Sequence, residues 1–309
     1  MKRRSFIKKG AATASIMGLG ISGLNAMAES DITIQQAANS FQLKYAPHLG
    51  MFKNTAGDDP IDQLNFMADQ GFTAFEDNGM KNKSVALQEK MAKTMADRNM
   101  TMGVFVAHKI YWKEATLTTG KEESRKEFLE QIEESVAVAK RVNAKWMTVV
   151  PGHLDLKLDI GFQTANVVET LKYASDILEK NELIMVLEPL NFYNHPGLFL
   201  TKIPQAFEVC KAVNSSSCKI LFDIYHQQIE EGNLIPNMKM AWEEIAYFQI
   251  GDNPGRKEPT TGEINYKNIF KYIHSRDYKG ILGMEHGNSK KGKEGEVAVI
   301  EAYKQSDSF

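Results

Sequence analysis

Four polar residues lie at the ends of short hydrophobic runs in the second half of the chain. Glu188 follows LIMVL, Asp223 follows KILF, Gln249 lies in FQIGD and Glu285 lies in ILGMEHG. Three carboxylates that meet in apolar surroundings repel one another unless a divalent cation lies among them. Oxygen ligands without a thiolate favour Mg²⁺ or Mn²⁺. We therefore predict one divalent metal site formed by these four residues; the alternative for any single one is a salt bridge or a helix cap.

Similar hydrophobic runs recur along the whole chain and predict eight strands. We expect them near residues 42–45, 74–76, 101–107, 146–150, 184–188, 219–223, 246–250 and 281–285. Several runs are almost continuously apolar, which is typical of parallel strands buried on both faces. Amphipathic segments with helical spacing lie between them, for example over residues 58–70, 122–142, 162–180 and 265–275.

Eight strand–helix units in a chain of 309 residues predict an α/β fold, a single-domain (β/α)8 TIM barrel. A doubly wound open sheet is the alternative, but no G-x-G-x-x-G follows the first strand. Chemistry in such a barrel lies at the carboxyl ends of the strands. Six of the seven histidines follow a predicted strand end, namely His48, His108, His153, His195, His226 and His286.

Five segments carry a resemblance to a known family. LEPLN, NHPGLFLT, FDIYHQQIEEGNL, FQIGDNPGRKEPTTGEINY and GILGMEHG are similar to the hydroxypyruvate isomerase family, within the xylose isomerase-like TIM barrels. The resemblance is strongest over residues 184–286. It implies that the four residues above are the metal ligands and that Glu188 and Glu285 are also the catalytic acid/base pair.

The same resemblance implies that His226 and Arg256 contact substrate oxygens. We add His108 and Glu258 to this substrate-binding set. For Arg256 the alternative is a surface salt bridge with Glu258. Tyr111 and Trp112, after the third strand, could stack on a sugar ring or belong to the core or a lid.

The expected reaction is the interconversion of an α-hydroxy aldehyde and a ketone through an enediolate. A carboxylate removes a proton from carbon and returns it to the neighbouring carbon. The metal ion binds the carbonyl and hydroxyl oxygens of the substrate and stabilises the enediolate. A ketose 3-epimerase or a keto-sugar dehydratase would use the same site. A non-catalytic sugar-binding barrel is a further alternative. Residues in the third and fourth strand-end loops, together with export, favour a sugar or keto-sugar over hydroxypyruvate as substrate.

The first 28 residues predict an export signal. Residues 1–10 are basic, an apolar run follows, and Ala26-Met27-Ala28 fits a cleavage site before Glu29. Arg3 and Arg4 within RRSFIK resemble the twin-arginine signal, which uses the twin-arginine translocase. We expect cleavage after Ala28 and a periplasmic domain over residues 29–309; an uncleaved N-terminal anchor is the alternative.

Charge and cysteine content narrow the function classes further. Without the first 28 residues, 32 basic and 39 acidic residues leave a net charge of −7. This balance argues against nucleic-acid binding, and so against a nuclease of the endonuclease IV type. We expect a small carbohydrate or hydroxy-keto acid as ligand. The sequence does not decide between a monomer and a homo-oligomer. Cys210 and Cys218 are expected to be buried thiols, with a disulfide as the alternative.

Overall fold

Eight apolar runs form parallel strands in the computed structural model, which describes residues 41–309. The strands are β1 (Lys44–Ala46), β2 (Ala74–Phe75), β3 (Thr101–Met102), β4 (Trp146–Val149), β5 (Ile184–Leu187), β6 (Cys218–Asp223), β7 (Ile245–Gln249) and β8 (Ile281–Gly283). All eight lie where the hydrophobic runs predict them. The strand predicted over residues 101–107 is regular only to Met102, because the chain beyond it forms a single bridge, Val106 to Thr148.

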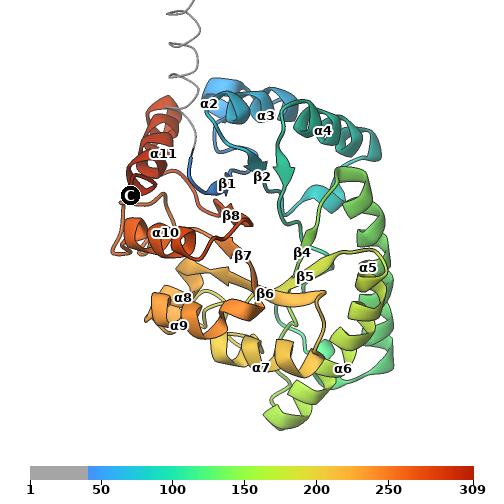
Figure 1. Ribbon diagram of the computed structural model, residues 1–309. Coiled ribbons are helices and arrows are strands. Elements are labelled where there is room, and N and C mark those ends of the chain that lie inside the picture. The colour runs from blue at the N-terminus through green and yellow to red at the C-terminus, as the bar shows by residue number, and fades with distance from the viewer. Residues whose placement is uncertain (1–40) are drawn as a thin grey trace, which may run out of the picture. The chain divides into compact units, whose positions relative to one another are not determined.

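Helices follow the strands and lie outside them (Figure 1). They are α2 (Lys53–Ala56), α3 (Pro60–Asp69), α4 (Val85–Asp97), α5 (Glu122–Val142), α6 (Ile160–Glu179), α7 (Ile203–Val213), α8 (Ile224–Glu230), α9 (Leu234–Ala241), α10 (Tyr266–Ser275) and α11 (Gly292–Ser306). Local signals set several ends. Asp159 caps α6 by accepting a hydrogen bond from the Gly161 N–H, and α7 ends where Asn214 adopts a left-handed conformation.

The strands close into a barrel. Six of them pair in the order β1-β8-β7-β6-β5-β4, and β2 pairs with β3. The Glu76 N–H donates to the Pro47 carbonyl at 3.1 Å, joining the end of β2 to the end of β1. The Thr148 N–H donates to the Phe105 carbonyl at 2.8 Å, joining β4 to the chain after β3. The predicted single (β/α)8 barrel is therefore confirmed, and the open-sheet alternative is excluded.

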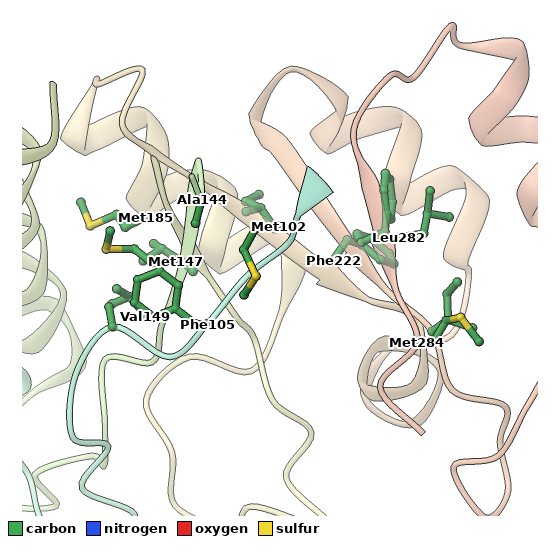
Figure 2. Close-up of a cluster of buried hydrophobic side chains, with 14 of the residues drawn as sticks. Met102, Phe105, Ala144, Met147, Val149, Met185, Phe222, Leu282 and Met284 are labelled. Atoms are coloured by element: carbon green, nitrogen blue, oxygen red, sulfur yellow. The ribbon is translucent and has the colours of Figure 1, made fainter. Parts of the chain in front are cut away.

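Two hydrophobic clusters lie on opposite sides of the strands. The larger one packs helices against the outer face of the barrel; Figure 2 shows part of it, where Phe105, Met147 and Val149 lie together. The smaller one takes side chains from nearly every strand and fills the inside: Ala46, Ala74, Val104, Val186, Leu221, Tyr247 and Ile281. Successive side chains of a strand point to opposite faces, so residues two positions further on face the interior again. This register places Glu76, Glu188, Asp223 and Gln249 in the interior layer at the carboxyl ends.

Some expectations fall at or beyond the limits of the described chain. The predicted signal, residues 1–28, lies outside residues 41–309. No helix among the described residues is long and apolar enough to cross a membrane.

Two further expectations concern residues within the barrel. Cys210, on α7, and Cys218, on β6, are both buried free thiols. His226 lies in the first turn of α8, directly after the end of β6.

Candidate active site

Asp223 is the last residue of β6 and also caps the helix that follows. Its Oδ1 accepts hydrogen bonds from the backbone N–H groups of Tyr225, at 2.8 Å, and His226, at 3.2 Å. These bonds satisfy the free N–H groups at the start of α8. Because Oδ1 is held by the helix, Oδ2 is turned to the barrel mouth, where it accepts from Nη2 of Arg256 at 2.8 Å.

Arg256 joins Asp223 to Glu285. The same Nη2 donates to Oε2 of Glu285 at 2.7 Å, and Nε donates to the Glu285 carbonyl at 3.0 Å. The loop that carries Arg256 is organised by buried Asp252, whose carboxylate accepts from the backbone N–H groups of Asn253, Gly262 and Ile264. The arginine is therefore held between two of the predicted ligands. The alternative salt bridge with Glu258 does not form.

Glu188 and Glu285 have different surroundings. Glu285 accepts from Nδ2 of Asn78 at 2.8 Å as well as from Arg256. The carboxylate of Glu188 accepts no hydrogen bond from the described residues, and its Oε1 lies 3.9 Å from Nε2 of His226. Burial, followed by the Glu285 and Asp223 carboxylates, raises the pKa of Glu188 well above its usual range. Burial also raises the pKa of Glu285, while Arg256 opposes that rise.

Gln249 ends β7 next to Asp223, its partner in the strand pairing. Its Nε2 donates to Oε1 of Glu76 at 3.2 Å. Its Oε1 is buried and has no hydrogen-bond partner among the described residues. A buried acceptor without a donor costs free energy, so this oxygen is suited to a cation. Glu76 was not among the predicted site residues.

His226 lies next to the carboxylates of Glu188 and Asp223, and its hydrogen bonds show which ring nitrogen carries the proton. Its Nδ1 faces the Asn191 backbone N–H, at 3.3 Å, and Nδ2 of the same residue, at 2.6 Å. Nδ1 therefore accepts, and the ring proton is on Nε2, 3.5 Å from Oδ2 of Asp223. Burial lowers the pKa of His226 to about 4, so the ring is neutral near pH 7.

The donor set fits a hard divalent ion. Donor atoms of Glu188, Asp223 and His226 lie within 4.8 Å of one another. His226 has its proton on the nitrogen that faces the group, so it is a hydrogen-bond donor there rather than a ligand. The carboxylates of Glu188, Asp223 and Glu285 and the free oxygen of Gln249 remain, and all four donors are oxygens of the kind that Mg²⁺ and Mn²⁺ bind.

A cavity of about 260 Å³ opens beside this group. It is lined by His48, Leu49, Glu76, Asp77, Asn78, Gly79 and Glu285. On another side Trp112 stacks on His195, with ring centroids 5.1 Å apart, and His195 lies 5.5 Å from the ring of His226. Trp112 is 46% exposed, so the chain after β3 adds an aromatic edge to the mouth. The site thus combines clustered carboxylates with space for a small polar molecule.

His108 and Glu258 are held by contacts of a different kind. Nδ1 of His108 donates to the Lys109 carbonyl, Nε2 accepts from the Val150 N–H, and the ring packs edge-on against Phe128. Glu258 is 1% exposed and accepts from the backbone N–H and the hydroxyl of Ser289. Neither side chain has a hydrogen bond to the four predicted ligands.

Comparison with known proteins gives consistent family relationships. The profile of the xylose isomerase-like TIM barrel family matches residues 64–305. Hydroxypyruvate isomerase of Escherichia coli is 37% identical over 171 residues, which are 54% of this chain and 64% of that protein. The 2-oxo-tetronate isomerase of Cupriavidus necator is 31% identical over 138 residues, 45% of this chain and 53% of that protein. The chain thus spans less than two thirds of the length of these relatives.

A solved structure shows how far the fold extends. The AP endonuclease, family 2, of Brucella melitensis superposes with a TM-score of 0.72 over 82% of this chain and 96% of that chain. The two sequences are 24% identical. At that identity the similarity concerns the barrel alone, because one barrel fold hosts many reactions.

Proposed function

The chain belongs to the xylose isomerase-like TIM barrel family, and we propose that it is a metal-dependent isomerase of the hydroxypyruvate isomerase type, acting on a small sugar or keto-sugar. Both curated relatives described above are named as isomerases. The observation that carries the proposal is the clustering of the Glu188, Asp223 and Glu285 carboxylates at the barrel mouth, with a cavity on the Glu285 side. Gln249, whose amide oxygen has no hydrogen-bond partner among the described residues, pairs with Asp223 across β6 and β7.

Glu188, Asp223, Gln249 and Glu285 would hold the ion. When bound, a divalent ion supplies positive charge next to the carbonyl and hydroxyl oxygens of the substrate. Asp223 and Glu285 are kept in position for this role by the guanidinium of Arg256, which contacts both. Each carboxylate oxygen has two lone pairs, so these contacts leave capacity for a ligand bond.

Glu188 is the better candidate for moving the proton. A carboxylate that takes a proton from carbon and returns it works best when its pKa is raised toward the working pH. Burial raises the pKa of Glu188, and its carboxylate accepts no hydrogen bond from the described residues that would favour the ionised form. Glu285 is held by Asn78 and Arg256, two donors that favour its ionised form. We therefore assign proton removal to Glu188 and a supporting role, delivery to the opposite face where required, to Glu285.

His226 and Arg256 would orient the substrate. The Nε2–H of His226 is buried and makes no hydrogen bond to the described residues. It can therefore donate to a substrate oxygen on which negative charge develops. Arg256 contributes a fixed positive charge from the facing loop. Trp112 and His195 provide an apolar wall for carbon-bound hydrogens of a sugar.

The test is proton exchange with solvent. The purified chain, loaded with Mn²⁺ or Mg²⁺, is incubated in deuterated water with a panel of aldoses, ketoses, keto-sugars and hydroxy-keto acids. NMR that shows deuterium at a carbon next to a carbonyl, dependent on added metal and on Glu188, supports the proposal. A panel without exchange, although the metal binds, would contradict the isomerase and favour the non-catalytic alternative.

The product distinguishes the reactions that share this site. Transfer of the carbonyl to the neighbouring carbon defines an isomerase, and inversion at one carbon without transfer defines a ketose epimerase. A product lighter by one water defines a dehydratase. Mass spectrometry and NMR of the same samples therefore assign the reaction class.

We also propose that residues 1–28 direct the protein to the periplasm through the twin-arginine translocase. The motif RRSFIK and the A-x-A site before Glu29 support this. Replacing Arg3 and Arg4 by lysine should retain the precursor in the cytoplasm, as cell fractionation would show. Periplasmic delivery of that variant at the normal level would contradict the proposal.

A further inference from the structure

Glu76 is a buried carboxylate that the proposed reaction does not use. It follows β2, is 1% exposed and takes part in two side-chain hydrogen bonds. Oε2 accepts from the hydroxyl of Tyr247 at 2.9 Å, and Oε1 accepts from Nε2 of Gln249 at 3.2 Å. The Tyr247 hydroxyl in turn accepts from the Val104 N–H at 3.4 Å. Glu76 thus joins a tyrosine inside the barrel to a predicted metal ligand.

The chain makes room for this arrangement with two glycines. A Cβ built on Gly283, in β8, would lie 1.9 Å from Oε2 of Glu76. A Cβ built on Gly103, after β3, would lie 2.3 Å from the hydroxyl oxygen of Tyr247. Any other residue at either position would displace the carboxylate or the phenol. The pairing of Glu76 with Tyr247 therefore depends on β7, on β8 and on the chain after β2 and β3.

We propose that Glu76 is a positioning residue that fixes the amide of Gln249, so that its Oε1 is presented to the metal ion. A glutamine amide can turn by 180° with almost no change of shape, and only its hydrogen bonds decide which atom faces the site. Burial and the Glu285 carboxylate raise the pKa of Glu76, while the hydrogen bonds from Tyr247 and Gln249 oppose that rise. In the ionised form, which these two donors favour, Glu76 offers acceptors alone to Gln249, so it holds Nε2 and leaves Oε1 free. Partners of this kind orient metal ligands and strengthen the site. The inference depends on the proposed function, because it assumes that Gln249 is a ligand.

The substitution Glu76→Gln tests the assignment with little change of volume. The Tyr247 hydroxyl still needs an acceptor, so it draws the oxygen of the new amide toward itself. The new NH₂ group then faces Gln249, repels its NH₂ and turns its oxygen away from the ion. We expect Mn²⁺ affinity, measured by calorimetry on the metal-stripped full chain, to fall about ten- to a hundredfold.

The double variant Glu76→Gln, Tyr247→Phe separates positioning from packing. Without the hydroxyl, the new amide is free to turn its oxygen to Gln249, and most of the lost Mn²⁺ affinity should return. A role in packing alone predicts no such rescue. Tyr247→Phe by itself leaves the contact between Glu76 and Gln249 intact and should bind Mn²⁺ like the parent chain.

Glu296→Gln is the matched control. Glu296 is also 1% exposed and also hydrogen-bonded, but to Asn54 and Thr55 at the start of α2. It should keep the parent affinity for Mn²⁺; a loss equal to that of Glu76→Gln would overturn the positioning role. Parent affinity in Glu76→Gln, or equal weakness in the single and double variants, would overturn it too, while the proposed function stands. A parent chain that binds neither Mn²⁺ nor Mg²⁺ would overturn the proposed metal site and this inference with it.

Discussion

The backbone N–H and the side-chain amide of Asn191 both lie within hydrogen-bonding distance of Nδ1 of His226, at 3.3 and 2.6 Å. Two donors at one ring nitrogen leave the proton on the other, so Nε2–H faces the carboxylates of Asp223 and Glu188. Asn191, in the loop after β5, therefore sets the tautomer of His226, in the helix after β6. His226 then serves the site as a neutral donor.

The variant Asn191→Asp should reverse this tautomer. An aspartate carboxylate accepts a hydrogen bond from Nδ1–H, so the single proton of the neutral ring moves from Nε2 to Nδ1. We expect kcat to fall roughly a hundredfold, the usual effect of removing one donor to a developing oxyanion, with little change in Mn²⁺ affinity. Steady-state kinetics and calorimetry measure the two quantities.

Asn194→Asp supplies the control for that experiment. Asn194 is exposed, lies three residues along the same loop and contacts Asn191 and Tyr225 but not His226. It adds the same charge without offering an acceptor to Nδ1. Equal loss of kcat in both variants would show that loop charge, not the tautomer, is responsible.

Glu188→Gln should lose turnover by about 10²- to 10⁴-fold, because it removes the base. Glu285→Gln should also lose turnover, because it changes a proposed metal ligand. The two variants should differ in whether the carbon-bound proton of the substrate still exchanges with solvent deuterium. With Glu188 as the base, Glu285→Gln still exchanges the carbon-bound proton with deuterium, whereas Glu188→Gln does not. Exchange that survives in Glu188→Gln and is lost in Glu285→Gln would reverse the two roles.

Metal addition should stabilise the folded chain. An ion that binds only the native state at a hundred times its Kd contributes about 2.7 kcal/mol to the free energy of unfolding. We therefore expect EDTA to remove activity, Mn²⁺ or Mg²⁺ to restore it, and Mn²⁺ to raise Tm in a melting experiment. In Gln249→Ala the rise should be smaller at the same ion concentration. A Tm that ignores both EDTA and Mn²⁺ would contradict the metal site.

The barrel and its mouth follow from local patterns in the sequence. Strands that are buried on both faces read as apolar runs, and α5 has the bounds that its periodicity predicts, residues 122–142. The first polar residue after each run then falls near the mouth, which is why Glu188 and Asp223 could be selected. β2 and β3 have only two regular residues each, so the strand predicted over residues 101–107 is longer than the one that forms.

Hydrogen bonds between residues that are far apart in the sequence could not be predicted from such local patterns. Asn78 and Glu285 are 207 positions apart, and nothing in either segment indicates their hydrogen bond. Arg256 contacts Asp223 and Glu285 rather than the nearby Glu258, because the loop around Asp252 turns it inward. For Glu76 a signal existed. Ala74 faces the barrel interior, so the alternation of a strand places Glu76 in the same layer as Gln249.

Stability should decline in mild acid through His108. Its ring lies between the Lys109 carbonyl and the Val150 N–H, and burial lowers its pKa to about 4 from a reference of 6.5. Between these two values the unfolded chain binds a proton that the folded chain does not, so the free energy of unfolding falls as the pH falls from 6.5 toward 4. The effect should be about 1 to 2 kcal/mol at pH 5.

Urea unfolding at pH 7.5 and pH 5 measures this difference in the free energy of unfolding, and His108→Gln should lose the part of it that is due to His108. His274→Gln, at an exposed position of α10, is the matched control; an unchanged pH difference in His108→Gln would contradict the assignment.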